Sequence, residues 1–322
     1  MITILVHRDG RTTAADRVDP AWLEDGSGAV VWVHLAAPGP EESRLLSGTF
    51  GFHELAVEDA LQVVHHPKIE TYDGYLYVIL HGIDFQASQH EFATHDADFF
   101  VGPNYLVTVT DGTSRTIPET QALCARNPRI MAEGPMALMH RIVDTMVDHY
   151  RPEVDELEAR IDELEDSVFE GGDTRWANQE ILGLKRNVAS LRRIMLPQRD
   201  VLGRLGRREF PQISAEMAYR FRDVYDHVVR LTDDALLFHD RLSAILEAHL
   251  SNVSNRLNEI MKILTIFSAI FMPMTVLTGL YGMNVSLAHF PGGEAAQFGW
   301  IVGIMACVAA GMLWLFRRWR WW

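Results

Sequence analysis

Two long uncharged runs close the chain and dominate its hydrophobic pattern. Residues 263–293 contain no Asp, Glu, Lys or Arg, and a second uncharged run extends from 295 to 316. Each run holds about 20 predominantly apolar residues, which is enough to cross a bilayer as a helix. The alternative, a buried hairpin of core helices, needs a globular partner large enough to cover both runs. The pattern therefore predicts two transmembrane helices, at 263–283 and 298–316.

Basic residues flank these runs unequally. The loop at 284–297 has no Lys or Arg and one acid, Glu294, whereas the tail at 317–322 consists of three Arg and three Trp. Lys and Arg stay on the cytoplasmic side of a membrane, and Trp favours the interface. We therefore expect a multi-pass protein of the cell (inner or plasma) membrane, with the loop outside and both termini in the cytoplasm.

The first 130 residues show a mixed pattern. Short β-type runs lie at 2–7, 29–35, 75–80, 96–102 and 104–110, and turn pairs such as Asp73-Gly74 and Asp111-Gly112 separate them. Helical stretches interrupt the runs near 40–50 and 53–62. Residues 1–130 are thus predicted to form an α/β cytoplasmic domain, a sheet flanked by helices.

Residues 131–262 have a helical period and predict a stalk of long helices. One amphipathic helix is expected over 136–169, ended by Gly171-Gly172, and another over 174–196, with Pro197 as its stop. From Ser214 to Thr278 there is no Gly, and the only Pro is Pro273. A helix capped by Ser214 is therefore expected to continue into the first span, over roughly 100 Å. Such a helix needs packing partners from its own chain or from other copies.

One face of the first span is polar or small, and we call this face the seam. Its members follow at alternating spacings of three and four residues: Asn258, Met261, Thr265, Ser268, Met272, Thr275 and Gly279. A polar stripe on a membrane helix faces a bundle interior or a water-filled path. The alternative is that the hydroxyls bond their own backbone and that small residues allow close packing. One span cannot enclose a pore, so a water-lining seam requires a closed ring of copies, in which methionine rings can block ions by dewetting.

The charge distribution favours a cation pathway. The chain carries a formal charge of −14, and its last 60 residues carry +2, so the first 262 carry −16. Such acidity argues against a nucleic-acid partner and concentrates cations near a pore, although it also simply keeps a large domain soluble. Neither span contains a carboxylate, so a passing cation keeps much of its water. Mg²⁺ dehydrates reluctantly and suits such a path, whereas Zn²⁺ more often meets His, Cys or carboxylate ligands.

The first span ends in Tyr281-Gly282-Met283-Asn284, and here the sequence resembles the CorA family of divalent-cation channels, two-span proteins with a Gly-Met-Asn signature. The likeness extends over 258–284, the second span, the basic tail, DVYDH at 223–227 and SNVSN at 251–255. It implies a funnel-shaped homopentamer whose first spans line the pore. It also implies uptake of Mg²⁺, with Co²⁺ and Ni²⁺ as further candidates, driven by the membrane potential and stopped by cytoplasmic Mg²⁺.

The resemblance also implies roles for single residues in the pore. The selectivity filter at the outer mouth would consist of Gly282, Met283 and Asn284. Gate or constriction positions fall on Asn258, Met261, Leu264 and Met272, and Leu264 lies beside the seam. By the same likeness, Asp223 and Glu247 match carboxylate sites between subunits where regulatory Mg²⁺ binds. Their partner carboxylate would come from a neighbouring chain, with Asp84 as a candidate.

The loop after the motif departs from the Mg²⁺ members, because VSLAHFPGGEAAQ lacks their Met-Pro-Glu-Leu stretch. Glu294 still supplies an acid at the outer mouth, and His289 is placed to respond to pH or zinc. The ZntB branch, which moves Zn²⁺ and is thought to couple to protons, therefore stays open. A second alternative is a non-conducting membrane-anchored scaffold or sensor.

No enzymatic signature is present: the sequence has no GxxxxGK[ST], GxSxG or HExxH. We therefore expect no enzyme and no covalently bound cofactor. The expected partners are other copies of the chain, membrane lipid, and a divalent cation as both substrate and regulator.

Overall fold

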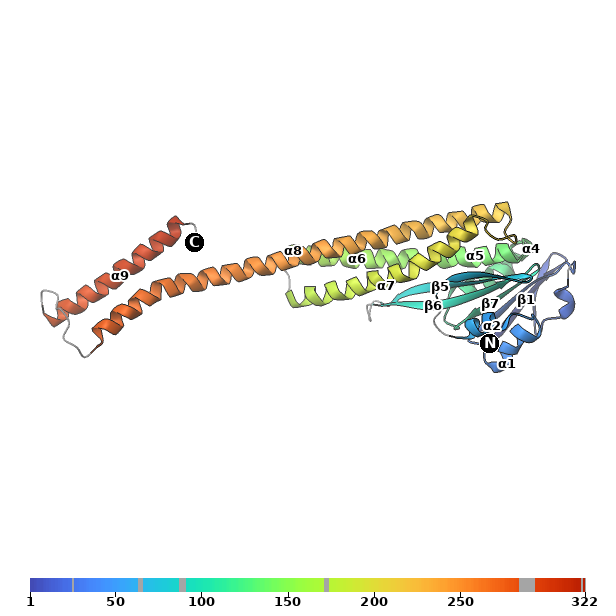
Figure 1. Cartoon of the computed structure of the whole chain (residues 1–322), viewed down its shortest axis with the longest axis horizontal. Coiled ribbons are helices and arrows are strands. Elements are labelled where there is room, and N and C mark those ends of the chain that lie inside the picture. Colours follow the sequence, from blue (N-terminus) through green and yellow to red (C-terminus); the bar gives the residue numbers. More distant parts are fainter. Residues whose placement is uncertain are drawn as a thin grey trace. The chain divides into compact units, whose positions relative to one another are not determined.

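The computed structural model describes residues 1–24, 26–62, 66–86, 91–170, 174–283, 293–319 and 321, without the side chains at 84–86, 91–93, 174, 294, 295 and 297. These residues form two compact units, 1–246 and 247–322. The first unit holds a mixed sheet covered by helices, and the second holds the two apolar helical segments (Figure 1).

The first unit is built on a seven-stranded sheet in the order β2-β1-β3-β7-β6-β5-β4. Neighbouring strands are antiparallel except for β3 and β7, which pair in parallel. The strands are β1 (Ile2–Arg8), β2 (Arg11–Ala15), β3 (Val30–Ala36), β4 (Lys68–Tyr72), β5 (Tyr75–Gln86), β6 (Glu91–Val101) and β7 (Tyr105–Thr110). All five predicted strands are confirmed. The hydrophobic pattern missed β2 and β4 because these two edge strands are short and largely polar.

Helices cover both faces of this sheet (Figure 1). The short 3₁₀ helix η1 (Pro20–Trp22) precedes β3, and α1 (Pro40–Gly48) and α2 (Glu54–Leu61) follow it. Leu46 of α1 and Ala56 and Ala60 of α2 pack on one face, in a core that includes Val33 and Tyr77. On the other face, α5 (Pro135–Asp148) and α7 (Thr174–Gly206) contact the central strands.

The expected helix over 136–169 is divided at His149 into α5 and α6 (Tyr150–Phe169). Two shorter helices, α3 (Thr116–Arg126) and α4 (Arg129–Ala132), precede α5. The expected stop at Pro197 is wrong, because α7 continues to Gly206. An internal proline costs roughly 3 kcal/mol in a helix, but the residues around it, including Met195, Val201 and Leu202, are buried and offset this cost.

Gln198, the neighbour of Pro197, joins α7 to the sheet. Strand β5 extends beyond β4, whose last partner is Ile79, so the next backbone groups on that side lack a strand. The N–H of His81 donates to Gln198 Oε1 at 3.1 Å, and the hydroxyl of Tyr150 donates to the His81 carbonyl and to Gln198 Oε1. Side chains of α6 and α7 thus provide the hydrogen bonds that the backbone of His81 cannot make to β4.

The last two helices carry both apolar runs. Helix α8 (Ala215–Tyr281) begins where the sequence predicts, since Ser214 Oγ accepts the N–H of Met217 at 3.2 Å. It continues without interruption into the first apolar run, as expected. Helix α9 (Glu294–Arg318) contains the second run. The predicted fold class, an α/β domain followed by long helices and two apolar C-terminal helices, is confirmed.

In the first unit, α8 buries a regular apolar stripe, again at spacings of three and four. Its members are Phe221, Val224, Val228, Leu231, Ala235, Phe238, Leu242 and Ile245. The opposite face of the helix is exposed. A helix of this length is not stable alone in water, and burial of this stripe in the first unit gives it the packing partners that it needs.

The buried Asp98 carboxyl on β6 makes the stability of the first unit depend on pH. Burial raises the pKa of Asp98 to about 7, nearby Asp96 and Asp59 add to this, and the hydrogen bond from Tyr77 Oη at 2.6 Å opposes it. The folded chain therefore keeps this proton to a higher pH than the unfolded chain. The resulting stabilisation is complete below about pH 4 and is lost as the pH rises through about 7.

We expect Asp98→Asn to remove this pH dependence, because asparagine does not titrate and still accepts from Tyr77. Between about pH 5 and about pH 8, the wild type should lose on the order of a few kcal/mol of stability relative to the variant. Thermal unfolding of the full chain in detergent at the two pH values measures the difference. Parallel pH profiles for the two proteins would contradict a protonated, buried Asp98.

Candidate functional site

The second unit exposes an unusually apolar surface. Helices α8 and α9 each contain a segment apolar and long enough to span a membrane, and none of these segments is buried among the described residues. Large side chains such as Phe267, Phe271 and Val276 are 58–63% exposed. A soluble protein rarely leaves so extended an apolar surface uncovered. Lipid is the solvent that suits it.

Every member of the seam is exposed on α8. Met261 is 58% exposed and Met272 is 70% exposed. Asn258, Ser268 and Gly279 belong to the same exposed row. The polar stripe is therefore not covered by the described residues of its own chain. In a bilayer such a stripe needs water or a second polar surface.

The threonine hydroxyls of the seam bond their own helix, as the packing alternative expects. Thr265 Oγ1 donates to the Met261 carbonyl at 2.7 Å, and Thr275 Oγ1 donates to the Phe271 carbonyl at 2.9 Å. A hydroxyl has one donor and two acceptor lone pairs. With the donor occupied, each threonine presents only acceptors to its surroundings. An acceptor-only surface suits a cation or the O–H groups of its hydration water.

The seam continues beyond the predicted members toward the N-terminus of α8. The same alternation of three and four residues reaches ten further positions, and all are exposed: Asp223, Asp226, Arg230, Asp233, Leu237, Asp240, Ala244, Glu247, Ser251 and Ser254. Six of these ten residues are charged: Asp223, Asp226, Arg230, Asp233, Asp240 and Glu247. The seam predicted from the span alone did not include this continuation, although the unbroken heptad spacing is present in the sequence.

Gly282 closes α8 at the start of the Gly-Met-Asn motif. Its N–H donates to the Thr278 carbonyl at 2.9 Å, and the N–H of Met283 reaches Leu280 O at 3.4 Å. A Cβ atom at position 282 would lie 2.9 Å from the Thr278 carbonyl oxygen, closer than real Cβ contacts. The helix end therefore requires glycine for a steric reason. Met283 is 57% exposed.

The remaining predicted residues of the outer mouth are only partly described. Asn284 and His289 lie outside the described residues. Glu294 is the first residue of α9, and its side chain lies outside the description. The filter and mouth assignments therefore stay predictions.

The predicted regulatory carboxylates do not form a site within one chain. Asp223 and Glu247 are both exposed on α8, about seven helical turns apart, so they cannot share one ion. Asp84 lies on β5, paired with Ala93, and its side chain is outside the description. Among the described residues, no group of three His, Cys, Asp or Glu could hold a metal ion. Any regulatory site at Asp223 or Glu247 needs ligands from elsewhere.

Known proteins resemble this chain over nearly its whole length. Residues 27–318 match the family described as CorA-like Mg²⁺ transporter protein. The chain is 31% identical to the cobalt/magnesium transport protein CorA of Thermotoga maritima, over 98% of this chain and 89% of that protein. It is 27% identical to the cobalt/magnesium transport protein CorA of Methanocaldococcus jannaschii, over 100% of both chains. The complete structure of the Methanocaldococcus jannaschii CorA magnesium transporter matches with a TM-score of 0.84 at 23% identity, covering 99% of this chain and 98% of that one, so the fold is shared.

We expect Gly282→Ala to destabilise the end of the first span, because the new Cβ must displace the Thr278 carbonyl. Gly279→Ala is the matched control, since a Cβ at position 279 meets no atom within 4 Å. We expect a loss of about 1–3 kcal/mol for Gly282→Ala, the cost of relieving a steric clash, and no loss for Gly279→Ala. Thermal unfolding of both full-length variants in detergent compares them. Equal stability would show that the helix end tolerates a side chain at position 282.

Proposed function

Because the chain belongs to the family of CorA-like Mg²⁺ transporter proteins, we propose that it is a channel for divalent cations, above all Mg²⁺. Family membership establishes divalent-cation transport across a membrane. The preferred ion, the driving force, the number of subunits and the gating are parts of our proposal, with Co²⁺ and Ni²⁺ as further candidate ions.

The exposed seam of α8 is the observation that carries the proposal. The acceptor-only hydroxyls of Thr265 and Thr275 and the exposed methionines lie on one helix face, which one span cannot close into a tube. We infer a homopentamer in which five first spans place this face toward a common axis, with α9 and lipid outside. Leu264 lies beside the seam and would support the constriction from the interface between neighbours.

A hydrated ion suits this lining. The described part of the first span, 263–283, contains no carboxylate to replace water around a divalent ion. Mg²⁺ binds its water tightly and prefers oxygen ligands, so hydroxyls and amides that accept from its hydration shell fit it well. At the outer mouth, Gly282, Met283 and Asn284 would form the filter, with His289 in the following loop and Glu294 at the start of α9.

The membrane potential supplies enough energy for uptake. An inside-negative potential favours entry by about 2.3 kcal/mol per elementary charge per 100 mV, and a divalent ion gains twice that amount. With both termini in the cytoplasm, the acidic N-terminal part would lie on the side that receives the ion. Its charge would concentrate cations there.

We also propose that cytoplasmic Mg²⁺ closes the channel by binding between subunits. Asp223 and Glu247 are exposed, acidic and positioned on the same face of α8 as the seam. An ion shared with a carboxylate of the next copy, such as Asp84, would lock neighbouring α8 helices in one arrangement. Loss of the ion would return like charges to close range and favour opening.

The zinc alternative keeps one supporting feature, the loop after the Gly-Met-Asn motif with its single Glu and His289. Proton-coupled Zn²⁺ uptake would follow a proton gradient, whereas Mg²⁺ conduction follows only the electrochemical gradient of the ion. A scaffold or sensor would assemble but would not conduct.

We expect Met272→Ala to raise the residual Mg²⁺ flux in high cytoplasmic Mg²⁺, because it removes an apolar ring that excludes water from the closed pore. Met274→Ala is the matched control, since position 274 lies about 200° around the helix from Met272 and is not a member of the seam. Flux into proteoliposomes measured with a Mg²⁺-sensitive dye should rise severalfold only for Met272→Ala. The same flux for both variants would argue that the seam does not face the pore.

We expect Asp223→Ala and Glu247→Ala to leave conduction intact but to weaken closure by internal Mg²⁺, because each removes a ligand charge from the proposed interface. The Mg²⁺ concentration for half-closure should rise by about tenfold, the effect of losing one charged hydrogen-bond or ion-pair partner. Asp200→Asn, an exposed acid on α7, serves as the control for a lost negative charge. Unchanged closure in both α8 variants would refute the regulatory assignment.

A further inference from the structure

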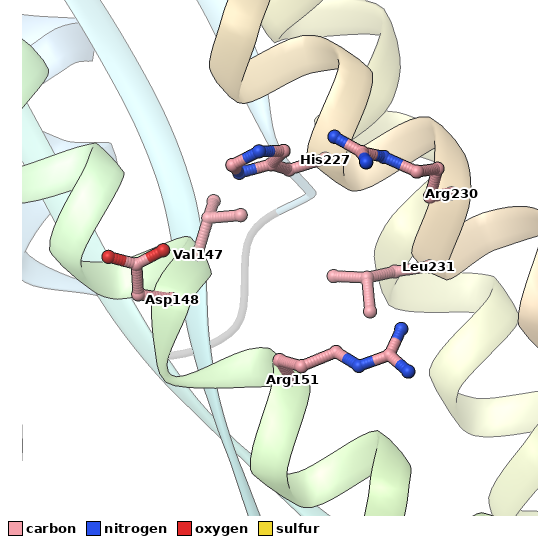
Figure 2. A pocket seen from close by; sticks show the side chains of 6 residues that line it. All are labelled: Val147, Asp148, Arg151, His227, Arg230 and Leu231. Atoms are coloured by element: carbon pink, nitrogen blue, oxygen red, sulfur yellow. The ribbon is translucent and has the colours of Figure 1, made fainter.

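A hollow in the first unit gathers basic side chains, one of which, Arg230, also lies on the exposed face of α8 that continues the seam. It lies between the α5–α6 junction and α8 and has a volume of about 330 Å³. The lining residues are Val147, Asp148, Arg151, His227, Arg230 and Leu231 (Figure 2). Ligand pockets of small molecules start at about this size. Its basic lining is unexpected in a region of strong net negative charge.

Within the part of the chain that the structure describes, Arg230 is the arginine of this hollow without an acidic partner. Its Nε donates to the Asp226 carbonyl at 3.3 Å, and among the described residues no carboxylate lies within ion-pair distance of its guanidinium. The terminal N–H groups of the Arg230 guanidinium are therefore available to a ligand. Figure 2 shows the side chain extending along α8 toward His227. A guanidinium fork matches the oxygens of a phosphate in a bidentate geometry.

His227 adds a donor beside Arg230, and Arg151 adds donors from α6. Arg151 Nε lies 2.8 Å from Asp155, and its Nη1 lies 3.2 Å from Asp234, which leaves the other terminal nitrogen for a ligand. His227 makes no hydrogen bond or ion pair with the residues that the structure describes. Even a neutral imidazole offers one N–H donor. The donors thus come from both α6 and α8.

The acids around the hollow limit which anion fits. Asp155 and Asp234 balance the charge of Arg151, and in Figure 2 the carboxylate of Asp148 lies across the hollow from Arg230. The site therefore cannot stabilise a dense polyanion. The apolar side chains of Val147 and Leu231, both buried, form the rest of the wall. This combination suits one phosphate group attached to a small organic body.

From this geometry we propose that the hollow is a binding site for a soluble phosphate monoester, with the phosphate on Arg230, Arg151 and His227. The bound anion joins the α5–α6 junction to α8 through hydrogen bonds to both. It stabilises the first unit by mass action, because the unfolded chain has no such site. An effect on conduction would rest on the function proposed above, whereas binding itself does not.

The test compares wild type, Arg230→Gln and a control variant as full-length protein in detergent without divalent cations. Isothermal calorimetry and thermal shift use two probes, inorganic phosphate and AMP, at low ionic strength because exposed charges are screened by salt. Arg193→Gln, an exposed arginine on α7 outside the hollow, is the control for lost positive charge. Circular dichroism checks that all three proteins are folded.

We expect wild type and Arg193→Gln to bind AMP more tightly than inorganic phosphate, and to unfold at a higher temperature with either. Arg230→Gln should weaken binding of both probes by about tenfold or more, since it removes charge-assisted hydrogen bonds. Two outcomes would overturn the proposal. One is that wild type binds neither probe at millimolar concentration, and the other is that Arg230→Gln binds them as wild type does.

Discussion

One helix of this chain must be stable in two solvents, water and lipid. Helix α8 buries an apolar stripe from Phe221 to Ile245 against its own unit in water. A second row of residues, shifted by two positions along the chain from this stripe, lies on the opposite face of the helix. This row stays exposed from Asp223 to Gly279, a range that includes the apolar segment. In water that exposed face costs little. In lipid, a row of polar groups without a partner is expensive, so this face has to meet water or other polar groups, and assembly of several copies is the direct way to provide them.

Helix capping and backbone satisfaction explain how the chain holds this helix in place. Ser214 starts α8, and the network of Gln198, Tyr150 and His81 ties the neighbouring helices to the sheet. That network also explains how α7 passes through Pro197, because the residue after the proline is buried and bonded to the strand backbone. The sheet, the helical layer and the start of α8 are therefore parts of one connected structure within the first unit.

The hydrophobic pattern predicted the features that local chemistry determines. The central strands, the cap at Ser214 and the continuous α8 follow from alternation, turn residues and an unbroken helical period. The polar edge strands β2 and β4 do not, because they exist only through pairing with a neighbour. Pro197 misled the prediction for a similar reason: its local cost is offset by tertiary contacts with residues far away in sequence. The division at His149 has no signal as strong as a proline or glycine.

The same limit applies to the candidate site. The spacing of the seam was visible in the sequence because it lies on a single helix, whereas the steric need for glycine at position 282 emerged only from the structure. Partners for Asp223 and Glu247 could not be predicted, since two residues of one straight helix cannot converge and their ligands must come from another element or another copy. The acceptor-only state of Thr265 and Thr275 needed the hydrogen bonds of the structure, which also show that backbone bonding and a water-facing role are compatible.

The decisive experiment is a measurement of ion flux into proteoliposomes under a set membrane potential, with Mg²⁺ compared with Zn²⁺ and with and without a proton gradient. We expect Mg²⁺ entry that follows the potential and is independent of the proton gradient. Zinc entry that requires the proton gradient, without potential-driven Mg²⁺ flux, would contradict this expectation. The absence of flux of either ion through correctly assembled protein would contradict it as well.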